Sequence, residues 1–195
     1  QGGSNSADPD TFGDDHAGII VTGTSAGVKI RGNTVGLGEF PPGTPVSSLA
    51  YGNAGDGIIV SVSEISIGGS APSDANVIAG NTRHGIVVKS SGVTGTQILG
   101  NFIGVHPALA NDLTLGNGYD GIHINAASTS FIGGAGATDF NTIAANGRNG
   151  VKLRNGGFNN GWGHLLQRNR IYGNAVNGTG VGIDLDYAED APNPE

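Results

Sequence analysis

The sequence has no cysteine and no methionine, and only nine of its 195 residues are lysine or arginine. Without cysteine the chain can form neither disulfide bonds nor thiol-based sites, so its residues indicate no redox compartment. Its formal net charge is −7, and so few cationic side chains cannot neutralise a phosphate backbone. We therefore expect no nucleic acid as a partner, whereas a neutral polysaccharide or a cationic ligand would fit this charge better.

Long apolar runs and helical patterns are also missing. No apolar stretch reaches the roughly 18 residues of a membrane span, and no signal-peptide pattern is present, although a cleaved signal would leave no trace. We therefore expect a soluble chain that does not insert into a membrane. No segment shows the spacing of about 3.6 residues that marks an amphipathic helix, which leaves β-strands as the regular structure we expect.

Glycine is abundant, with 37 of the 195 residues against a usual share of about 7%. Much of it belongs to a repeat in which glycine precedes a short aliphatic run with the two-residue alternation of a strand. The repeated pairs are Gly18-Ile19, Gly57-Ile58, Gly85-Ile86, Gly121-Ile122, Gly150-Val151 and Gly182-Ile183, and asparagine-bearing turns recur at Asn33, Asn81, Asn101, Asn169 and Asn174. Such self-similarity outweighs local signals and indicates a solenoid.

This repeat predicts an all-β fold, a right-handed parallel β-helix of about six coils. Glycine or asparagine at each corner allows a positive φ at little steric cost. Asparagines at equivalent corners can also stack into a ladder of hydrogen bonds. Two longer segments, 37–52 and 105–116, interrupt the repeat and are expected to be loops inserted on one side, which in solenoids is often the binding side.

The two ends of the chain differ in pattern from the repeat. Residues 1–17 are polar and lack alternation, so we expect them to be a leader or an N-terminal cap, and we expect residues 18–195 to form a single parallel β-helix domain. The last coil has no amphipathic helix that would cap its open strand edges. We therefore expect the domain to be part of a longer protein or to stack head to tail with copies of itself, which would give filaments.

Three segments carry a resemblance to a known group of proteins. They are IGGSAPSDANVIAGN (67–81), ILGNFIGVHPALANDLTLGNGYDGIHI (98–124) and GVGIDLDYAEDAPNPE (180–195). They resemble the Ile-Gly-Gly and Gly-Asn-x-Ile-Gly repeats of bacterial right-handed parallel β-helix proteins, whose architecture is that of the pectate-lyase-like fold. The resemblance implies a secreted or cell-surface protein, and its motifs specify a fold rather than a chemistry.

Aligning the Gly-Ile strands assigns each side chain to the inside or the outside of a coil, because alternate residues of a strand point to opposite faces. The first and third residues after glycine are aliphatic and are expected inside. The second residues, expected outside, are Ile20, Ile59, Val87, His123, Lys152 and Asp184, and the fourth are Thr22, Ser61, Lys89, Asn125, Arg154 and Asp186. The exterior should therefore have an apolar half, which something must cover, and a charged half that faces solvent.

The charged half is the candidate catalytic face, formed by His123, Lys152, Arg154, Asp184 and Asp186. Acid–base cleavage of an acidic polysaccharide needs a base and a cation that stabilises the developing enolate, roles that His123, Lys152 and Arg154 could fill. Hydrolysis would instead use paired carboxylates, and Asp184 and Asp186 are expected about 7 Å apart on one face, within the inverting range. Alternatively, the opposite charges on neighbouring strands pair for register and solubility alone.

The signatures of the pectin-degrading β-helix enzymes are absent from the sequence. It has neither the paired-Asp, Gly-His-Gly and Arg-x-Lys motifs of the hydrolases nor the Arg-x-Pro-x-x-Arg motif of the pectate lyases. This absence favours a chain that is not an enzyme.

Aromatic residues mark the candidate binding positions. Trp162 and His164 could form a sugar-stacking corner, and Tyr119 could add a second contact surface. Phe40 and Tyr51 lie in the first inserted loop, which is expected to contact a partner or to cover the apolar half of the exterior. A second protein chain is the other candidate cover.

Asp56 and Asp120 are the candidate metal ligands, because they occupy the same corner of their coils and carboxylate oxygens bind calcium. The alternative is that aspartate before glycine simply forms a common turn. Calcium is the one cofactor that the sequence suggests.

Two classes of function are open at this point. The first is a non-catalytic extracellular module, a rod that is structural, adhesive or self-assembling. The second uses the charged face on a polysaccharide, as a lyase or glycoside hydrolase of pectate-lyase-like fold, or as a glycan-binding module without catalysis.

Overall fold

The computed structural model describes residues 16–24, 26–38, 51–109, 113–154 and 163–186. This part of the chain is all-β, with parallel strands in three sheets, as a parallel β-helix would have. Two short 3-10 helices, Pro72–Asp74 and Pro107–Leu109, lie outside the sheets. Among the residues described, no helix is long and apolar enough to cross a membrane.

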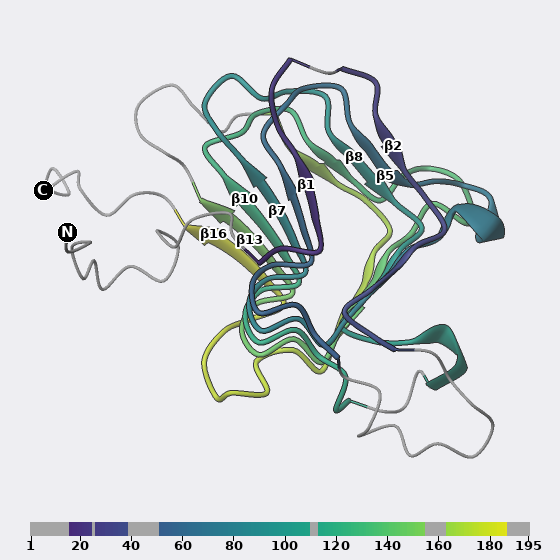
Figure 1. Ribbon diagram of the computed structural model, residues 1–195, viewed down its shortest axis with the longest axis vertical. Coiled ribbons are helices and arrows are strands. Elements are labelled where there is room, and N and C mark those ends of the chain that lie inside the picture. The colour runs from purple at the N-terminus through teal and green to yellow at the C-terminus, as the bar shows by residue number, and fades with distance from the viewer. Residues whose placement is uncertain (1–15, 25, 39–50, 110–112, 155–162, 187–195) are drawn as a thin grey trace, which may run out of the picture.

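The chain visits the three sheets in turn, so that each sheet takes every third strand (Figure 1). Sheet A contains, in order, β1 (Ile19–Val21), β4 (Ile58–Val60), β7 (Ile86–Lys89), β10 (Ile122–Asn125), β13 (Val151–Arg154) and β16 (Ile183–Asp186). Sheet B contains β2 (Lys29–Ile30), β5 (Ser66–Gly68), β8 (Gln97–Leu99), β11 (Phe131–Ile132) and β14 (Leu165–Leu166). Sheet C contains β3 (Thr34–Val35), β6 (Val77–Ile78), β9 (Phe102–Ile103), β12 (Thr142–Ala144) and β15 (Arg170–Tyr172).

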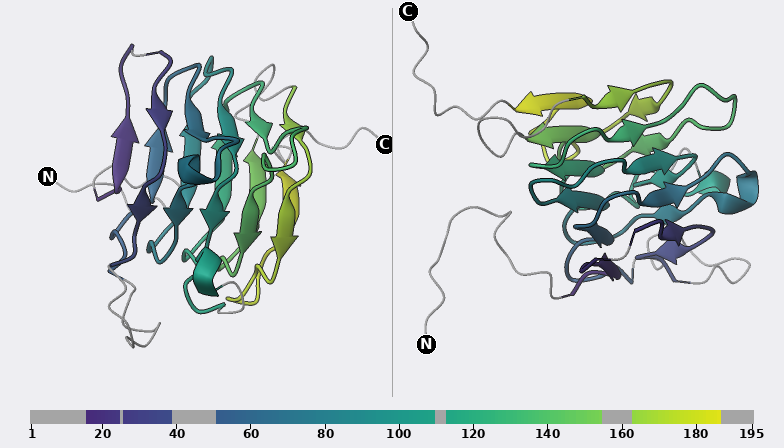
Figure 2. Two further views of the ribbon diagram at one scale, coloured as in Figure 1. Left: turned by 90° about the vertical axis from the view of Figure 1, so that its right-hand side faces the viewer. Right: turned by 90° about the horizontal axis from the view of Figure 1, so that it is seen from above.

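We call three consecutive strands, one from each sheet, a rung. Figure 2 shows the rungs side by side, with the colour running from purple at one end of the stack to yellow at the other. Every strand pairs only with the equivalent strand of the rung before or after it. Strand pairing therefore joins residues far apart in sequence at equivalent positions of adjacent rungs.

The register of sheet A confirms the alignment of the Gly-Ile strands. Ile59 pairs with Val87, Val87 with His123, and His123 with Lys152. The residues expected inside are fully buried in the middle rungs: Ile58, Val60, Ile86, Val88, Ile122, Ile124 and Val151. Isoleucines from sheets B and C complete the same core, namely Ile67, Ile98, Ile132, Ile78, Ile103 and Ile143. The interior is therefore aliphatic across all three sheets.

Glycine is required where the chain turns sharply beside the next rung. Gly68 and Gly104 both have positive φ, 78° and 81°. A β-carbon at Gly68 would collide with the carbonyl oxygen of Leu99, and one at Gly104 would collide with that of Ala144. Any other residue would thus meet both an unfavourable backbone conformation and a backbone clash at these corners.

Two asparagine ladders run along sheet C, one at each end of its strands. The first consists of Asn33, Asn76, Asn101, Asn141 and Asn169, and the second of Asn53, Asn81, Asn117, Asn146 and Asn174. In both, each side-chain amide donates to the Oδ1 atom of the next asparagine, at 2.8 to 3.0 Å. The predicted ladder is confirmed, and the turns that the sequence grouped together belong to two separate stacks.

Candidate functional site

A third polar stack lies at the corner where the chain enters sheet A. It consists of the residues directly before the Gly-Ile pairs, Asp56, His84, Asp120 and Asn149. The side chain of each accepts a hydrogen bond from the backbone N–H of the residue at the same corner of the next rung. The acceptors are Asp56 Oδ1 for His84, His84 Nδ1 for Asp120, Asp120 Oδ1 for Asn149 and Asn149 Oδ1 for Val181, at 2.9, 3.2, 3.0 and 2.8 Å. This corner stack explains why polar residues are tolerated at a buried corner.

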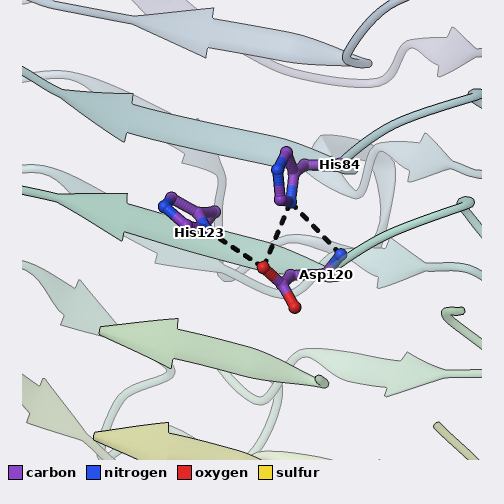
Figure 3. Close-up of side chains that lie close together, drawn as sticks. All are labelled: His84, Asp120 and His123. Carbon is purple, nitrogen blue, oxygen red and sulfur yellow. Dashed lines mark hydrogen bonds and ion pairs between the residues drawn. The ribbon is translucent and has the colours of Figure 1, made fainter. Parts of the chain in front are cut away.

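Two histidines meet the carboxylate of Asp120 within this stack (Figure 3). Oδ2 of Asp120 lies 2.9 Å from Nδ1 of His123 and 3.2 Å from Nδ1 of His84. The two imidazole rings are tilted against each other, with their centroids 4.6 Å apart. We call these three residues the His–Asp–His cluster. All three side chains are buried.

The carboxylate of Asp120 is held in place from both sides. Its other oxygen, Oδ1, accepts hydrogen bonds from the backbone N–H of Asn149 and from the Asn149 side-chain amide, at 3.0 and 2.9 Å. Burial raises the pKa of the Asp120 carboxyl, but the hydrogen bonds and positive charge of His123 and His84 outweigh burial and hold that pKa far below its usual range. Asp120 is therefore a carboxylate in this structure.

His123 was expected to face solvent, and that expectation is wrong. It lies on the outward side of β10, as the register predicted, yet only 2% of its surface is exposed. Its ring packs against His84, and its Nδ1 contacts Asp120. A substrate in solution cannot reach a base that is buried in this way.

The apolar half of the exterior is covered, as the sequence predicted, on two of its three strands. Ile59 and Val87 point outward but are only 2% and 7% exposed, so both are covered, whereas Ile20 on the first strand is 43% exposed. Phe40, in the loop proposed as the cover, lies outside the described residues, so its role stays a prediction.

The remaining charged candidates follow the ion-pair interpretation more closely than the catalytic one. Lys152 Nζ lies 3.6 Å from Oδ2 of Asp184 on the neighbouring strand, as the register predicted. Asp184 also accepts a hydrogen bond from the Asn149 side chain at 3.3 Å. Arg154 pairs in register with Asp186, whose side chain lies outside the description. The carboxylate of Asp184 is thus already engaged by two neighbours.

The candidate binding residues do not come together in the described structure. The ring of Tyr119 is covered by the guanidinium of Arg148, 4.1 Å from the ring centroid, and meets the edge of His84. His164 Nδ1 accepts the backbone N–H of Ser130 at 3.2 Å. Tyr51 is exposed. Trp162 lies outside the described residues, so the proposed sugar-stacking corner stays a prediction.

Asp56 and Asp120 do occupy equivalent corners, but the rung of His84 lies between them. Two rungs separate their backbones by roughly 9.6 Å, and Asp120 faces imidazoles rather than Asp56. Oδ2 of Asp56 instead lies 4.0 Å from Arg83. Calcium binding by these two residues stays a prediction.

The residue that sequence reasoning missed is His84. A signal for it exists, because aligning the residue before each Gly-Ile pair gives Asp56, His84, Asp120 and Asn149 in one column. Combined with the outward column that contains His123, this alignment places the two histidines on adjacent rungs. Comparison with known proteins adds no further residue, since the chain matches no family model, no curated protein and no solved structure.

Proposed function

We propose that the chain is a right-handed parallel β-helix of six coils, one for each strand of sheet A, and that its role is structural and non-catalytic. In this proposal it is a short rod, secreted or at a cell surface, that stacks end to end with copies of itself. Parallel crossover connections are almost always right-handed, which supports the handedness. The resemblance of its repeats supports the location.

The observation that carries this proposal is the exposure of core positions on β16, the last strand that the structure describes. Ile183 and Leu185 on β16 occupy the inward positions that are fully buried in the middle rungs. Here they are 45% and 60% exposed. Because aliphatic side chains gain free energy on leaving water, the end of the core is a surface that favours contact with a further coil.

A second copy of the chain offers a matching surface at its opposite end. The inward residues Ile19 and Val21 of β1 are partly buried and belong to the same repeat. Stacking β1 of one copy on β16 of another would continue both the aliphatic core and the strand pairing, and would pair backbone groups of the two outer strands of sheet A as the structure describes it. Because the two surfaces differ, this contact is heterologous and extends into filaments.

Light scattering of the chain over a range of concentrations tests the stacking. We expect the average mass to rise with concentration in the wild type and to stay at that of a monomer in Leu185→Lys, because a lysine at this edge would bury a charge in the contact. Gln97→Lys is the matched control, since it adds the same charge at an exposed position on β8, in the middle of sheet B. A wild type that remains monomeric at high micromolar concentration would refute self-association.

Incubation with polysaccharides tests the non-catalytic part of the proposal. Across a broad panel of acidic and neutral polysaccharides, with and without calcium, we expect neither new reducing ends nor unsaturated products that absorb in the ultraviolet. The reason is that His123 is buried and Lys152 is paired with Asp184. Product formation that disappears in His123→Ala and Lys152→Ala but persists in Gln97→Ala would contradict the proposal.

A further inference from the structure

The His–Asp–His cluster brings three metal-binding atoms to one point. One ring nitrogen each of His84 and His123 and a carboxylate oxygen of Asp120 all lie within 4.8 Å of one another, and both Nδ1 atoms contact Oδ2 of Asp120. They come from two adjacent rungs, so the rigid pairing of β7 with β10 fixes their relative positions. No rearrangement of the backbone is needed to bring them together.

Hydrogen bonds alone cannot satisfy all the polar atoms around Nδ1 of His84. Nδ1 of His84 lies 3.2 Å from the backbone N–H of Asp120, which needs an acceptor, and also 3.2 Å from Oδ2 of Asp120, which needs a donor. One ring nitrogen carries either a lone pair or a proton, so it cannot serve both. Without a proton its lone pair lies beside a carboxylate oxygen, and a cation held between Nδ1 and Oδ2 would turn this repulsion into two favourable contacts, at the cost of the hydrogen bond from the Asp120 N–H.

The ring of His123 points to the same conclusion. Its other nitrogen, Nε2, is buried and has no hydrogen-bond partner in the structure described. The polar contact that orients this ring is therefore the one between Nδ1 and Asp120. The carboxylate in turn is oriented by the two hydrogen bonds from Asn149, as outer-shell residues orient the ligands in metal sites.

We propose that His84, Asp120 and His123 form a binding site for a divalent transition metal ion, zinc in particular. Two imidazole nitrogens and one carboxylate oxygen are ligands that suit zinc, whereas calcium and magnesium prefer oxygen throughout. Three protein ligands leave a fourth position for water or a small exogenous ligand. The double positive charge of the ion would also compensate the buried carboxylate.

The distances are close to those that zinc requires. Ligand atoms at 2.0 to 2.2 Å from a tetrahedral zinc ion are about 3.3 Å apart, and the two nitrogen-to-oxygen distances are 2.9 and 3.2 Å. The third distance, between the two ring nitrogens, is at most 4.8 Å, so the imidazole rings would have to close around the ion by side-chain rotation. Because the cluster is buried, exchange of the ion with solvent is expected to be slow, and loading is best done during refolding.

The first experiment measures zinc retained by the full chain without a polyhistidine tag. The chain is refolded with excess zinc, desalted and analysed by elemental mass spectrometry, and we expect one zinc ion per chain. At a free-zinc concentration about one hundred times the dissociation constant, Tm should rise by about 5 to 10 °C. Calcium at the same concentration should leave Tm unchanged. Cobalt in place of zinc should give the visible absorption bands of a tetrahedral site.

The corner stack supplies conservative variants that separate metal binding from folding. Asn149 already occupies the position equivalent to His84, so His84→Asn keeps an acceptor for the N–H of Asp120 while removing a ring nitrogen. Asp120→Asn likewise keeps Oδ1 for Asn149. His164→Asn is the matched control, because His164 also accepts a backbone N–H through Nδ1 but lies outside the cluster. We expect both cluster variants to lose zinc and the control to retain it.

Several results would overturn the proposal. Substoichiometric zinc in the wild type, an unchanged Tm or a cobalt spectrum without tetrahedral bands would show that the cluster is a hydrogen-bonded network and nothing more. Full zinc retention by His84→Asn and Asp120→Asn would place the ion elsewhere. If a variant does not fold, zinc content and the cobalt spectrum of the wild type decide the question without it.

Discussion

Val88→Asp is expected to prevent the chain from folding at room temperature. Val88 is fully buried in β7 and belongs to the aliphatic core. A carboxyl group there has no partner, and its burial costs about 5 kcal/mol or more. Domains of this kind are stable by about 5 to 15 kcal/mol in total, and each rung contacts only its neighbours, so few other interactions can compensate.

Two neighbouring substitutions turn this expectation into a test of the register. Ile20→Asp changes an outward residue that is 43% exposed, so its melting temperature should be close to that of the wild type. Val87→Asp should fall between the two, because Val87 points outward but is covered. Thermal melts followed by circular dichroism measure all three. Equal destabilisation by Val88→Asp and Ile20→Asp would show that the assignment of inward and outward residues is wrong.

Asn101→Leu should have the second-largest effect, a loss of at least about 3 kcal/mol in the free energy of unfolding. Asn101 lies in the middle of a ladder, where its amide donates to Asn141 Oδ1 and to the carbonyl oxygens of Ile67 and Leu99. It also accepts from the amide of Asn76 at 2.9 Å. Leucine removes all of these bonds, and the buried backbone N–H of Asn76, which also donates to Asn101 Oδ1 at 3.2 Å, loses its acceptor there.

The first member of the same ladder provides the control. Asn33 is exposed and also donates to its neighbour, Asn76, so Asn33→Leu leaves groups that water can satisfy and should cost about 1 kcal/mol. Urea denaturation gives both free energies. If the two losses proved similar, the ladder would contribute to stability at its ends as much as in its centre, contrary to the burial argument.

The sequence predicts the parts of this structure that depend on position within a repeat. The Gly-Ile pairs place Ile58, Ile86 and Ile122 in one buried column, because the residues of a strand alternate strictly between two faces. The pairing of Lys152 with Asp184 follows from the same alignment. In both cases the interaction joins equivalent positions of adjacent rungs, which a repeat makes visible.

The candidate site could be predicted only in part, because it joins positions that are not equivalent. His84 precedes a Gly-Ile pair, whereas His123 follows one, so no single column contains both. The alternation of a strand also says whether His123 points outward but not whether anything covers it. Its contacts with His84 and Asp120 come from other positions of the repeat, which the alternation of its own strand does not show.

The direction of the hydrogen bonds has a mechanical consequence. Both the strand pairing and the asparagine ladders join one rung to the next, so these bonds point along the axis of the stack. A pulling force along that axis loads the interfaces between rungs in series, and each interface carries the whole force. Adding rungs would then lengthen such a rod without strengthening it, and its breaking force would be that of its weakest interface.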